Sequence, residues 1–353
     1  MRRWFGIGST DGYDQFIGAW IVMKVRVITN MRGLASTQYN GVDFEFLHDT
    51  SHGIRAVVAT FVRSFRYDYI LLNGALHNAL LLAILKSFVP FHRTKLVLLD
   101  ILLSTPVGLK GRIKAWLIGR LLKRVHKIML YYNNTKGLQQ HFGIPAAKFL
   151  YVPFKINQLE MISLMPPVDG GYVFCGGKTR RDFDTLFEAV KGLDCPVKLV
   201  TTDNRDIAQH GSYVDERTAP PNVEVVRLDG SPEAFISHMA SARVVVLPIK
   251  PDICGAGIGV YIMAMALKKC VIISSGPGAE DVLSSDQAII VPACDPLSLR
   301  EAIARAFNDS IYRRRYEEQG FNYAWPLRGE VRLLQSIIKA LHEDQVKSPA
   351  ASR

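Results

Sequence analysis

A strand, a glycine-rich turn, a helix and a second strand follow one another within residues 243–283. The first strand contains the β-branched run at residues 244–246, and the second contains Val271, Ile272 and Ile273. Strands that are apolar at every position are covered on both faces, which is typical of a parallel sheet between two layers of helices. The stretch therefore predicts a β-loop-α-β unit of such a sheet.

Three glycines, Gly255, Gly257 and Gly259, lie between the first of these strands and the helix. A helix start offers unpaired N–H groups and the positive end of the helix dipole, and glycines allow a ligand to approach the backbone closely. A phosphate group is the ligand that such a place favours. The G-x-G-x-G spacing differs from the G-x-G-x-x-G of dinucleotide-binding folds, and glycines that only make the turn are the alternative.

A second glycine-containing loop, residues 175–182, lies between a predicted strand and a predicted helix. It places Lys178, Arg180 and Arg181 directly after two glycines. Fixed cations in such a loop favour an anionic ligand, and they lower the barrier to a reaction in which a leaving diphosphate gains negative charge. Solvated basic residues beside an ordinary turn are the alternative.

The order of these features resembles the donor-binding core of family 4 glycosyltransferases. The resemblance rests on the glycine loop, the helix sequence at residues 264–266, the apolar strand after it, and Gly276-Pro277-Gly278 before Asp281. It implies the GT-B fold, an α/β architecture in which two Rossmann-like, doubly wound domains face a cleft and a C-terminal helix crosses back to the N-terminal domain. It also implies a nucleotide-sugar donor and catalysis without a metal or another cofactor.

The resemblance assigns roles to residues in both loops. Lys178 and Arg181 are expected to clasp the donor diphosphate as catalytic cations, with the identities of the family's Arg and Lys exchanged. The expected donor-binding residues are Gly176, Gly177, Arg180, Gly255, Ala256, Gly257, Ile258, Gly259 and Asp281. His77 follows a predicted strand and a glycine, so we add it as a catalytic candidate that could orient the transferred sugar. A histidine at a helix start or in the core is the alternative.

The chain departs from the family pattern in the helix after the glycine loop. Two glutamates separated by seven residues are usual there, and Gly255 and Met263 stand at those positions. Two alternatives to a transferase therefore stay open, namely a nucleotide-sugar epimerase of the same fold and an inactive binding or scaffold relative. Asp182 and Asp184 imitate a D-x-D metal motif, but acids in the first turn of a helix are explained by capping and the helix dipole, so we predict no metal site.

Length and composition set the frame for these expectations. The 353 residues suffice for two domains, and 48% hydrophobic and 21% charged residues are typical of an ordinary globular protein. No apolar run is long enough to span a bilayer, and no signal peptide is evident. The five cysteines lack C-x-x-C or zinc-like spacing, so we expect reduced thiols and a cytoplasmic location.

Strand and helix patterns alternate along both halves of the chain. We expect an acceptor-side N-terminal domain at 1–155, a nucleotide-sugar-binding C-terminal domain at 156–328, a crossover helix at 329–346 and a frayed tail at 347–353. The predicted elements of the first half are strands at 25–29, 42–47, 69–72, 95–99 and 128–130 and helices at 54–65, 77–87 and 111–126. This alternation predicts a parallel, doubly wound sheet in each domain.

Positive charge is concentrated in the first half of the chain. Residues 51–158 contain sixteen Lys and Arg against two acids, Asp68 and Asp100. On the predicted helix 111–126, we expect one apolar face to pack into the domain while the basic rim contacts an anionic membrane surface. That face comprises Ile113, Trp116, Leu117, Leu121 and Val125. A solvated basic helix is the alternative, and no recognition motif accompanies the charge, so we expect no nucleic-acid partner.

Taken together, these features predict a glycosyltransferase of the hexosyltransferase type. It would move a sugar from a nucleotide-sugar donor to a glycan or lipid-linked acceptor, with retention and without a metal, in polysaccharide biosynthesis. The expected location is cytoplasmic and peripheral on the inner face of the membrane.

Overall fold

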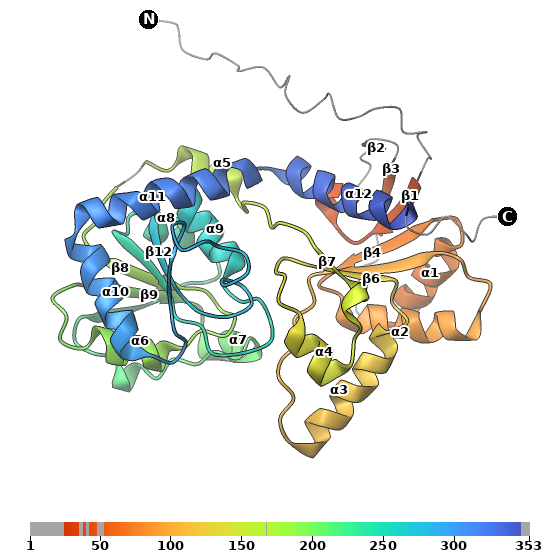
Figure 1. The fold of residues 1–353 in the computed structure, drawn as a ribbon, viewed down its shortest axis with the longest axis horizontal. Coiled ribbons are helices and arrows are strands. Elements are labelled where there is room, and N and C mark those ends of the chain that lie inside the picture. Colours follow the sequence, from red (N-terminus) through yellow and green to blue (C-terminus); the bar gives the residue numbers. More distant parts are fainter. Residues whose placement is uncertain (1–24, 35–37, 40–41, 48–52, 167, 347–353) are drawn as a thin grey trace, which may run out of the picture.

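The computed structural model describes residues 25–34, 38–39, 42–47, 53–166 and 168–346, so the predicted tail lies outside the described residues. Two α/β domains follow each other along the chain (Figure 1). The first domain contains a sheet in the order β2-β3-β1-β4-β5-β6-β7, in which only β2 is antiparallel to its neighbour. The strands are β1 (Val25–Thr29), β2 (Gln38–Tyr39), β3 (Val42–Phe46), β4 (Tyr69–Asn73), β5 (Lys95–Leu99), β6 (Lys127–Leu130) and β7 (Phe149–Tyr151). The α-helices of this domain are α1 (Ile54–Ser64), α2 (Leu76–Phe88), α3 (Gly108–Leu122) and α4 (Lys136–Phe142).

The second domain contains a fully parallel sheet in the order β10-β9-β8-β11-β12-β13. Its strands are β8 (Val173–Gly176), β9 (Val197–Thr201), β10 (Val223–Arg227), β11 (Val244–Leu247), β12 (Cys270–Ser274) and β13 (Ile289–Val291). The helices after the first domain are α5 (Leu159–Leu164), α6 (Phe183–Val190), α7 (Asn204–Gln209), α8 (Pro232–Ala240), α9 (Ile258–Ala266), α10 (Pro296–Asn308), α11 (Ser310–Ala324) and α12 (Glu330–Val346). Four of these strands, β8, β9, β11 and β12, have their apolar side chains buried, as strands covered on both faces must.

Helix starts in the second domain are set by capping side chains. Asp182 begins α6 by accepting from the backbone N–H of Thr185 at 3.3 Å and from its hydroxyl at 2.7 Å. Ser231, Asp295 and Asp309 cap α8, α10 and α11 in the same way. Capping therefore accounts for Asp182, as predicted from the sequence.

The last helix, α12, lies on the first domain although it follows the second one in the chain (Figure 1). It contacts a short 3₁₀ segment, η2 (Arg32–Leu34), and buries Leu334, Ile337 and Leu341 along one face. Apolar residues three and four positions apart share a helix face, so this burial follows from the spacing. Within the described residues, no helix is both long enough and apolar enough to cross a membrane.

Helix α3 does not pack with the face that the sequence pattern predicts. Ala115, Gly119 and Leu122 are its buried residues, whereas Ile113, Trp116 and Leu117 are each more than half exposed. The prediction that these three side chains enter the core is wrong. Gly119 faces inward where α3 approaches the end of α4 so closely that a Cβ at this position would overlap the carbonyl oxygen of Phe142.

This close approach predicts an unusual response to a glycine-to-alanine substitution. Gly119→Ala should destabilise the fold by roughly 2–4 kcal/mol, because the added methyl has to displace backbone rather than a flexible side chain. Gly111→Ala, in the first turns of the same helix, meets only ordinary contacts and should be neutral or stabilising by up to about 1 kcal/mol. Urea unfolding of both variants measures the difference, and equal effects would show that α3 does not pack through Gly119.

Candidate functional site

The two loops predicted to bind a donor lie side by side at the carboxyl edge of the second sheet. β8 and β11 are paired in register, so the loop after β8 and the loop after β11 leave the sheet together. Arg181 and Ile249 form a bridge between the loops, and the backbone N–H of Lys250 donates to the carbonyl of Arg180 at 2.8 Å. The carboxyl edge of a parallel sheet is the usual place for a ligand in such folds.

Arg181 lies inside the first of these loops rather than on its surface. The residue is 1% exposed, its Nε donates to the carbonyl of Gly176 and its Nη1 to that of Thr179, both at 2.8 Å. Burial lowers the pKa of Arg181 to about 10, so the guanidinium remains protonated at neutral pH. Gly177, at φ +106°, leaves room for it, since a Cβ there would overlap the guanidinium. In this geometry Arg181 shapes the loop, and its predicted contact with a diphosphate remains a prediction.

Lys178 and Arg180 point outward from the same loop and each has an acidic partner. Lys178 Nζ lies 2.6 Å from Oδ2 of Asp206 in α7, and Arg180 Nε lies 2.6 Å from Oδ2 of Asp252. Hydrogen bonding to Lys178 holds the pKa of Asp206 below its usual range. Both cations are partly exposed, so a bound anion could exchange for their carboxylate partners.

Asp252 connects the two domains, and the sequence analysis did not identify it. Its side chain is only 4% exposed. While Oδ2 pairs with Arg180, Oδ1 accepts from the backbone N–H and hydroxyl of Thr105 in the first domain, at 2.8 and 3.0 Å. A second link is the hydrogen bond from Asn133 Nδ2 to the carbonyl of Asp281 at 3.1 Å. Predicted donor residues Arg180 and Asp281 therefore lie at the interface between the domains.

The three glycines of the second loop serve different purposes. Gly257 precedes α9 with φ +89°, a conformation that favours glycine, and no side chain caps the helix. Gly255 packs against the ring of Tyr132 from the first domain so closely that a Cβ would overlap the ring. Gly259 faces Phe154 at ordinary contact distance. Ala256 and Ile258 between them are buried.

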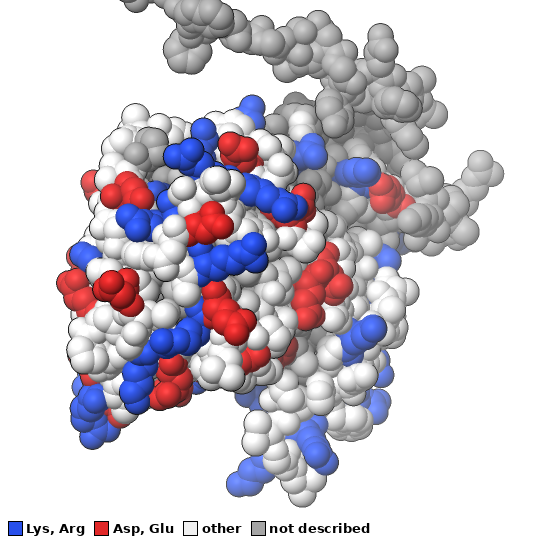
Figure 2. Space-filling model, turned by 60° about the vertical axis from the view of Figure 1, so that its left-hand side comes forward, with Lys and Arg blue, Asp and Glu red and all other residues white. Residues whose placement is uncertain are grey.

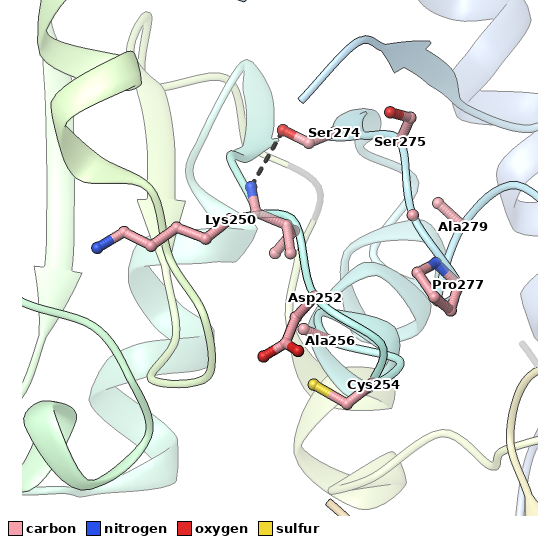
Figure 3. Close-up of a pocket in the computed structure, with 11 residues that line it drawn as sticks. Lys250, Asp252, Cys254, Ala256, Ser274, Ser275, Pro277 and Ala279 are labelled. Atoms are coloured by element: carbon pink, nitrogen blue, oxygen red, sulfur yellow. Dashed lines mark hydrogen bonds between the residues drawn. The ribbon is translucent and has the colours of Figure 1, made fainter. Parts of the chain in front are cut away.

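A small cavity lies where this loop meets the segment after β12 (Figure 3). Ala256, Cys254 and the segment 274–279 line it, and the hydroxyl of Ser274 accepts from the backbone N–H of Ile249 at 3.0 Å. The cavity measures about 10 Å³, about the room for one water, whereas ligand pockets usually measure hundreds of cubic ångströms. A nucleotide-sized ligand therefore requires the interface over these loops to open.

A larger pocket, of about 380 Å³, lies in the first domain at the carboxyl ends of β1, β3 and β4. Asn30 and Asn73 fix its rim, since Asn30 Nδ2 donates to the carbonyl of Asn73 at 3.0 Å and Asn30 Oδ1 accepts from the backbone N–H of Asn73 at 2.8 Å. The Oδ1 of Asn78, which also lines the pocket, is buried without a hydrogen-bond partner in the described part of the chain. His77 is the exposed second residue of α2 and does not line the pocket, and its catalytic role remains a prediction.

Asp100 is a further candidate that sequence reasoning missed. It follows β5 with a φ of +54°, and its backbone N–H donates to the carbonyl of Met129 at 2.9 Å. Burial raises the pKa of Asp100 to about 6. Burial also raises the pKa of Tyr131 and of Tyr132, and the nearby charge of Asp100 adds to both shifts. A carboxylate that titrates near neutral pH beside the interface is a typical feature of a functional site. Asp100 could have been found from the sequence, because it directly follows an apolar strand in a segment that contains one other acid.

Metal-ligating side chains do not gather in the parts of the chain that the structure describes. No group of three or more His, Cys, Asp or Glu residues is placed to hold a metal ion there. The five cysteines are free, and four of them are buried.

One family model matches part of the chain, within the second domain. The model of the family described as Glycosyl transferases group 1 matches residues 172–309, which covers both candidate loops. No curated protein sequence matches the chain.

Solved structures match over nearly the whole chain. HepE from Anabaena, in complex with UDP and glucose, is 14% identical with a TM-score of 0.59, covering 90% of this chain and 100% of that one. Sucrose-phosphate synthase from Thermosynechococcus elongatus is 15% identical with a TM-score of 0.60, covering 92% and 90%. A glycosyltransferase from Rickettsia africae is 12% identical with a TM-score of 0.58, covering 89% and 86%. The predicted GT-B fold is thereby confirmed.

The different environments of the two basic residues predict different effects on stability. Arg181→Met keeps much of the volume but leaves the carbonyls of Gly176 and Thr179 unpaired, so it should cost roughly 2–4 kcal/mol of unfolding free energy. Lys178→Met removes only an exposed ion pair and should change stability by no more than about 0.5 kcal/mol. Urea unfolding measures both, and comparable losses would refute the assignment of Arg181 as the residue that shapes the loop.

The raised pKa of Asp100 predicts a pH-dependent stability difference. The folded state holds the Asp100 proton up to about pH 6, whereas the unfolded chain releases it near its ordinary value, so stability falls as pH rises through this interval. Asp100→Asn should therefore be more stable than the native protein at pH 7–8 by roughly 1–3 kcal/mol, with the difference vanishing near pH 4. Asp281→Asn, at an exposed carboxylate, is the control. A pH-independent difference for Asp100→Asn in thermal unfolding would contradict the prediction.

Proposed function

We propose that the protein is a glycosyltransferase that moves a sugar from a nucleotide-sugar donor to an acceptor, because residues 172–309 match the model described as Glycosyl transferases group 1 and the chain has a GT-B fold. The observation that carries the proposal is the convergence of two cation- and glycine-containing loops, about seventy residues apart in sequence, at one edge of the second sheet. Structures of HepE contain UDP and UDP-glucose, and we propose a donor of the same class here.

The proposed reaction requires the two loops to stabilise a departing nucleoside diphosphate. Negative charge grows on the diphosphate as the glycosidic bond breaks, and preorganised cations and N–H groups lower that barrier. Lys178 and Arg180 are the outward-facing cations of the first loop, and the uncapped start of α9 after Gly257 supplies N–H groups from the second. We propose transfer with retention and without a metal, as the family resemblance implies.

The acceptor is proposed to bind on the first domain. The pocket beside Asn30, Asn73 and Asn78 offers amide groups suited to the hydroxyls of a sugar, and its size suits one monosaccharide unit. Asp100 lies at the same edge of that sheet and could accept the proton that the acceptor hydroxyl loses. We propose that the acceptor is a glycan or a lipid-linked molecule, used in polysaccharide biosynthesis at the inner face of the membrane.

One observation favours a second candidate, a relative that binds the donor without turning it over. Gly255 and Met263 replace the two glutamates that are usual in the resembling family. At Gly255 the ring of Tyr132 occupies the space into which any side chain would extend. In the closed arrangement of the domains, no acid could therefore be accommodated at this position.

Donor binding and turnover separate these candidates. Nucleoside diphosphates and their sugars, screened by thermal unfolding, should stabilise the protein by about 2.7 kcal/mol at one hundred times the dissociation constant. Lys178→Ala should lower donor hydrolysis or transfer roughly 10²-fold, as loss of one transition-state donor does, and EDTA should change neither rate. Arg314→Ala, on the exposed side of α11, is the control.

Each outcome of this screen selects one function. Stabilisation without hydrolysis or transfer across a broad donor panel would establish the binding relative, and recovery of an epimerised donor would establish the epimerase. Absence of stabilisation by every nucleotide would refute the proposed function.

A further inference from the structure

The outer layer of the first domain exposes apolar side chains to an unusual degree. Nineteen large hydrophobic residues are exposed among the described residues, and thirteen of them lie between residues 54 and 117, on or beside α1, α2 and α3. These helices contact one another in the order α1, α2, α3, so their outer surfaces form one continuous face. Exposed apolar side chains that gather on one face indicate an interaction surface.

An aromatic edge lies at the ends of α1 and α2. Phe88 and Phe91 are 79% and 74% exposed, and Phe65 is half exposed beside them. His92 fixes this edge, since its ring stacks on Phe61 at 4.6 Å and meets the edge of Phe65 at 4.3 Å. These ring contacts anchor the loop after α2, which contains Phe91, against the end of α1.

Helix α3 extends the same face. Ile113, Trp116 and Leu117 point outward because Ala115, Gly119 and Leu122 face the domain. The guanidinium of Arg120 lies over the Trp116 ring at 5.0 Å. Past the end of α3, Arg124 donates to the hydroxyl of Ser87, and this bond joins the end of α3 to the end of α2.

Charge in the segment that carries this face is mostly positive, although Arg63 of α1 pairs with Glu45 of β3. Residues 54–127 contain thirteen Lys and Arg against two acids, of which Asp100 lies at the interface between the domains. At the lower end of the first domain in Figure 2, the charged side chains in view are Lys and Arg among uncharged residues. Two copies of such a face would repel each other, and a nucleic acid would leave the aliphatic and phenylalanine side chains without partners. An anionic lipid surface matches both properties, since its headgroups attract the cations and its acyl boundary accepts the apolar side chains.

We propose that the α1–α3 face, defined by Phe65, Phe88, Phe91, Ile113, Trp116 and Leu117 with the surrounding Lys and Arg, docks on an anionic bilayer. The aromatic edge and Trp116 enter the headgroup region, and the cations contact lipid phosphates. Docking itself does not depend on the proposed transferase activity. Only the consequence, access to a lipid-linked acceptor, rests on the proposed function.

Co-sedimentation with vesicles tests the electrostatic part. The protein should bind vesicles of phosphatidylcholine with phosphatidylglycerol, bind those of phosphatidylcholine alone far less, and dissociate between about 50 and 500 mM NaCl. Arg112→Gln/Lys114→Gln should weaken binding about 25-fold, because each cation near an anionic leaflet contributes roughly fivefold. Arg314→Gln/Arg315→Gln, at exposed positions of α11 in the second domain, should leave binding unchanged.

A second double variant, with a matched control, tests the contribution of the apolar side chains to vesicle binding. Phe88→Ser/Phe91→Ser should weaken binding to anionic vesicles at least tenfold at fixed salt, because both side chains lose a nonpolar environment. Leu297→Ser/Ile311→Ser removes two equally exposed apolar side chains from the second domain and should have no effect. Thermal unfolding confirms that all variants are folded.

Insertion is measured with brominated lipid, which should quench fluorescence in the native protein and quench it less in Trp116→Phe. Four results would overturn the proposal. They are absence of binding to anionic vesicles at low salt, equal sensitivity to the second-domain variants, preferential binding of a short RNA over vesicles, and a dimer in solution that the Phe88→Ser/Phe91→Ser variant dissociates. Loss of donor binding with intact vesicle binding would refute only the proposed function.

Discussion

The parallel pairing of β8 with β11 is the interaction on which the candidate site depends. Val244, Val245 and Val246 pair with Val173, Phe174 and Cys175 in a fully buried register. Beyond the ends of these strands, a backbone bridge between Arg181 and Ile249 connects the two loops that follow them. The relative position of the two loops is therefore set by packed, fully buried strands. A change in the packing of those strands would displace the site.

The alternation of strands and helices could be predicted from residue patterns, because hydrophobic periodicity and turn residues are local signals, whereas the two-domain GT-B arrangement was expected from the family resemblance. Apolar strands, helix starts and glycine turns each depend on a few adjacent residues, and the predicted alternation agrees with both sheets. The orientation of α3 was not predictable in this way. Its inward face depends on Gly119 meeting the backbone at Phe142, a contact between separate elements that a residue-by-residue hydrophobicity pattern does not contain.

The same limit applies to the site. The sequence identifies Arg180 and Arg181 as neighbouring cations in a loop. Only the three-dimensional structure shows that Arg180 pairs with Asp252, whereas Arg181 is buried and donates to backbone carbonyls. Asp252 receives hydrogen bonds from Thr105, 147 residues away, so no sequence neighbourhood marks it. This contact also links the domains over the two candidate loops. The nucleotide binding proposed above would require a hinge motion that separates it.

Tyr132 and Gly255 together constrain how this chain could change over generations. The ring occupies the space beyond the α-carbon of Gly255, so an acid introduced at position 255 alone collides with it. A smaller residue at position 132 alone leaves a void between the domains, which is also unfavourable. The two positions are therefore epistatic: each single replacement should cost stability, and an acid at position 255 requires a smaller residue at position 132. As long as Tyr132 is present, any substitution of Gly255 is unfavourable, and this favours retention of the glycine.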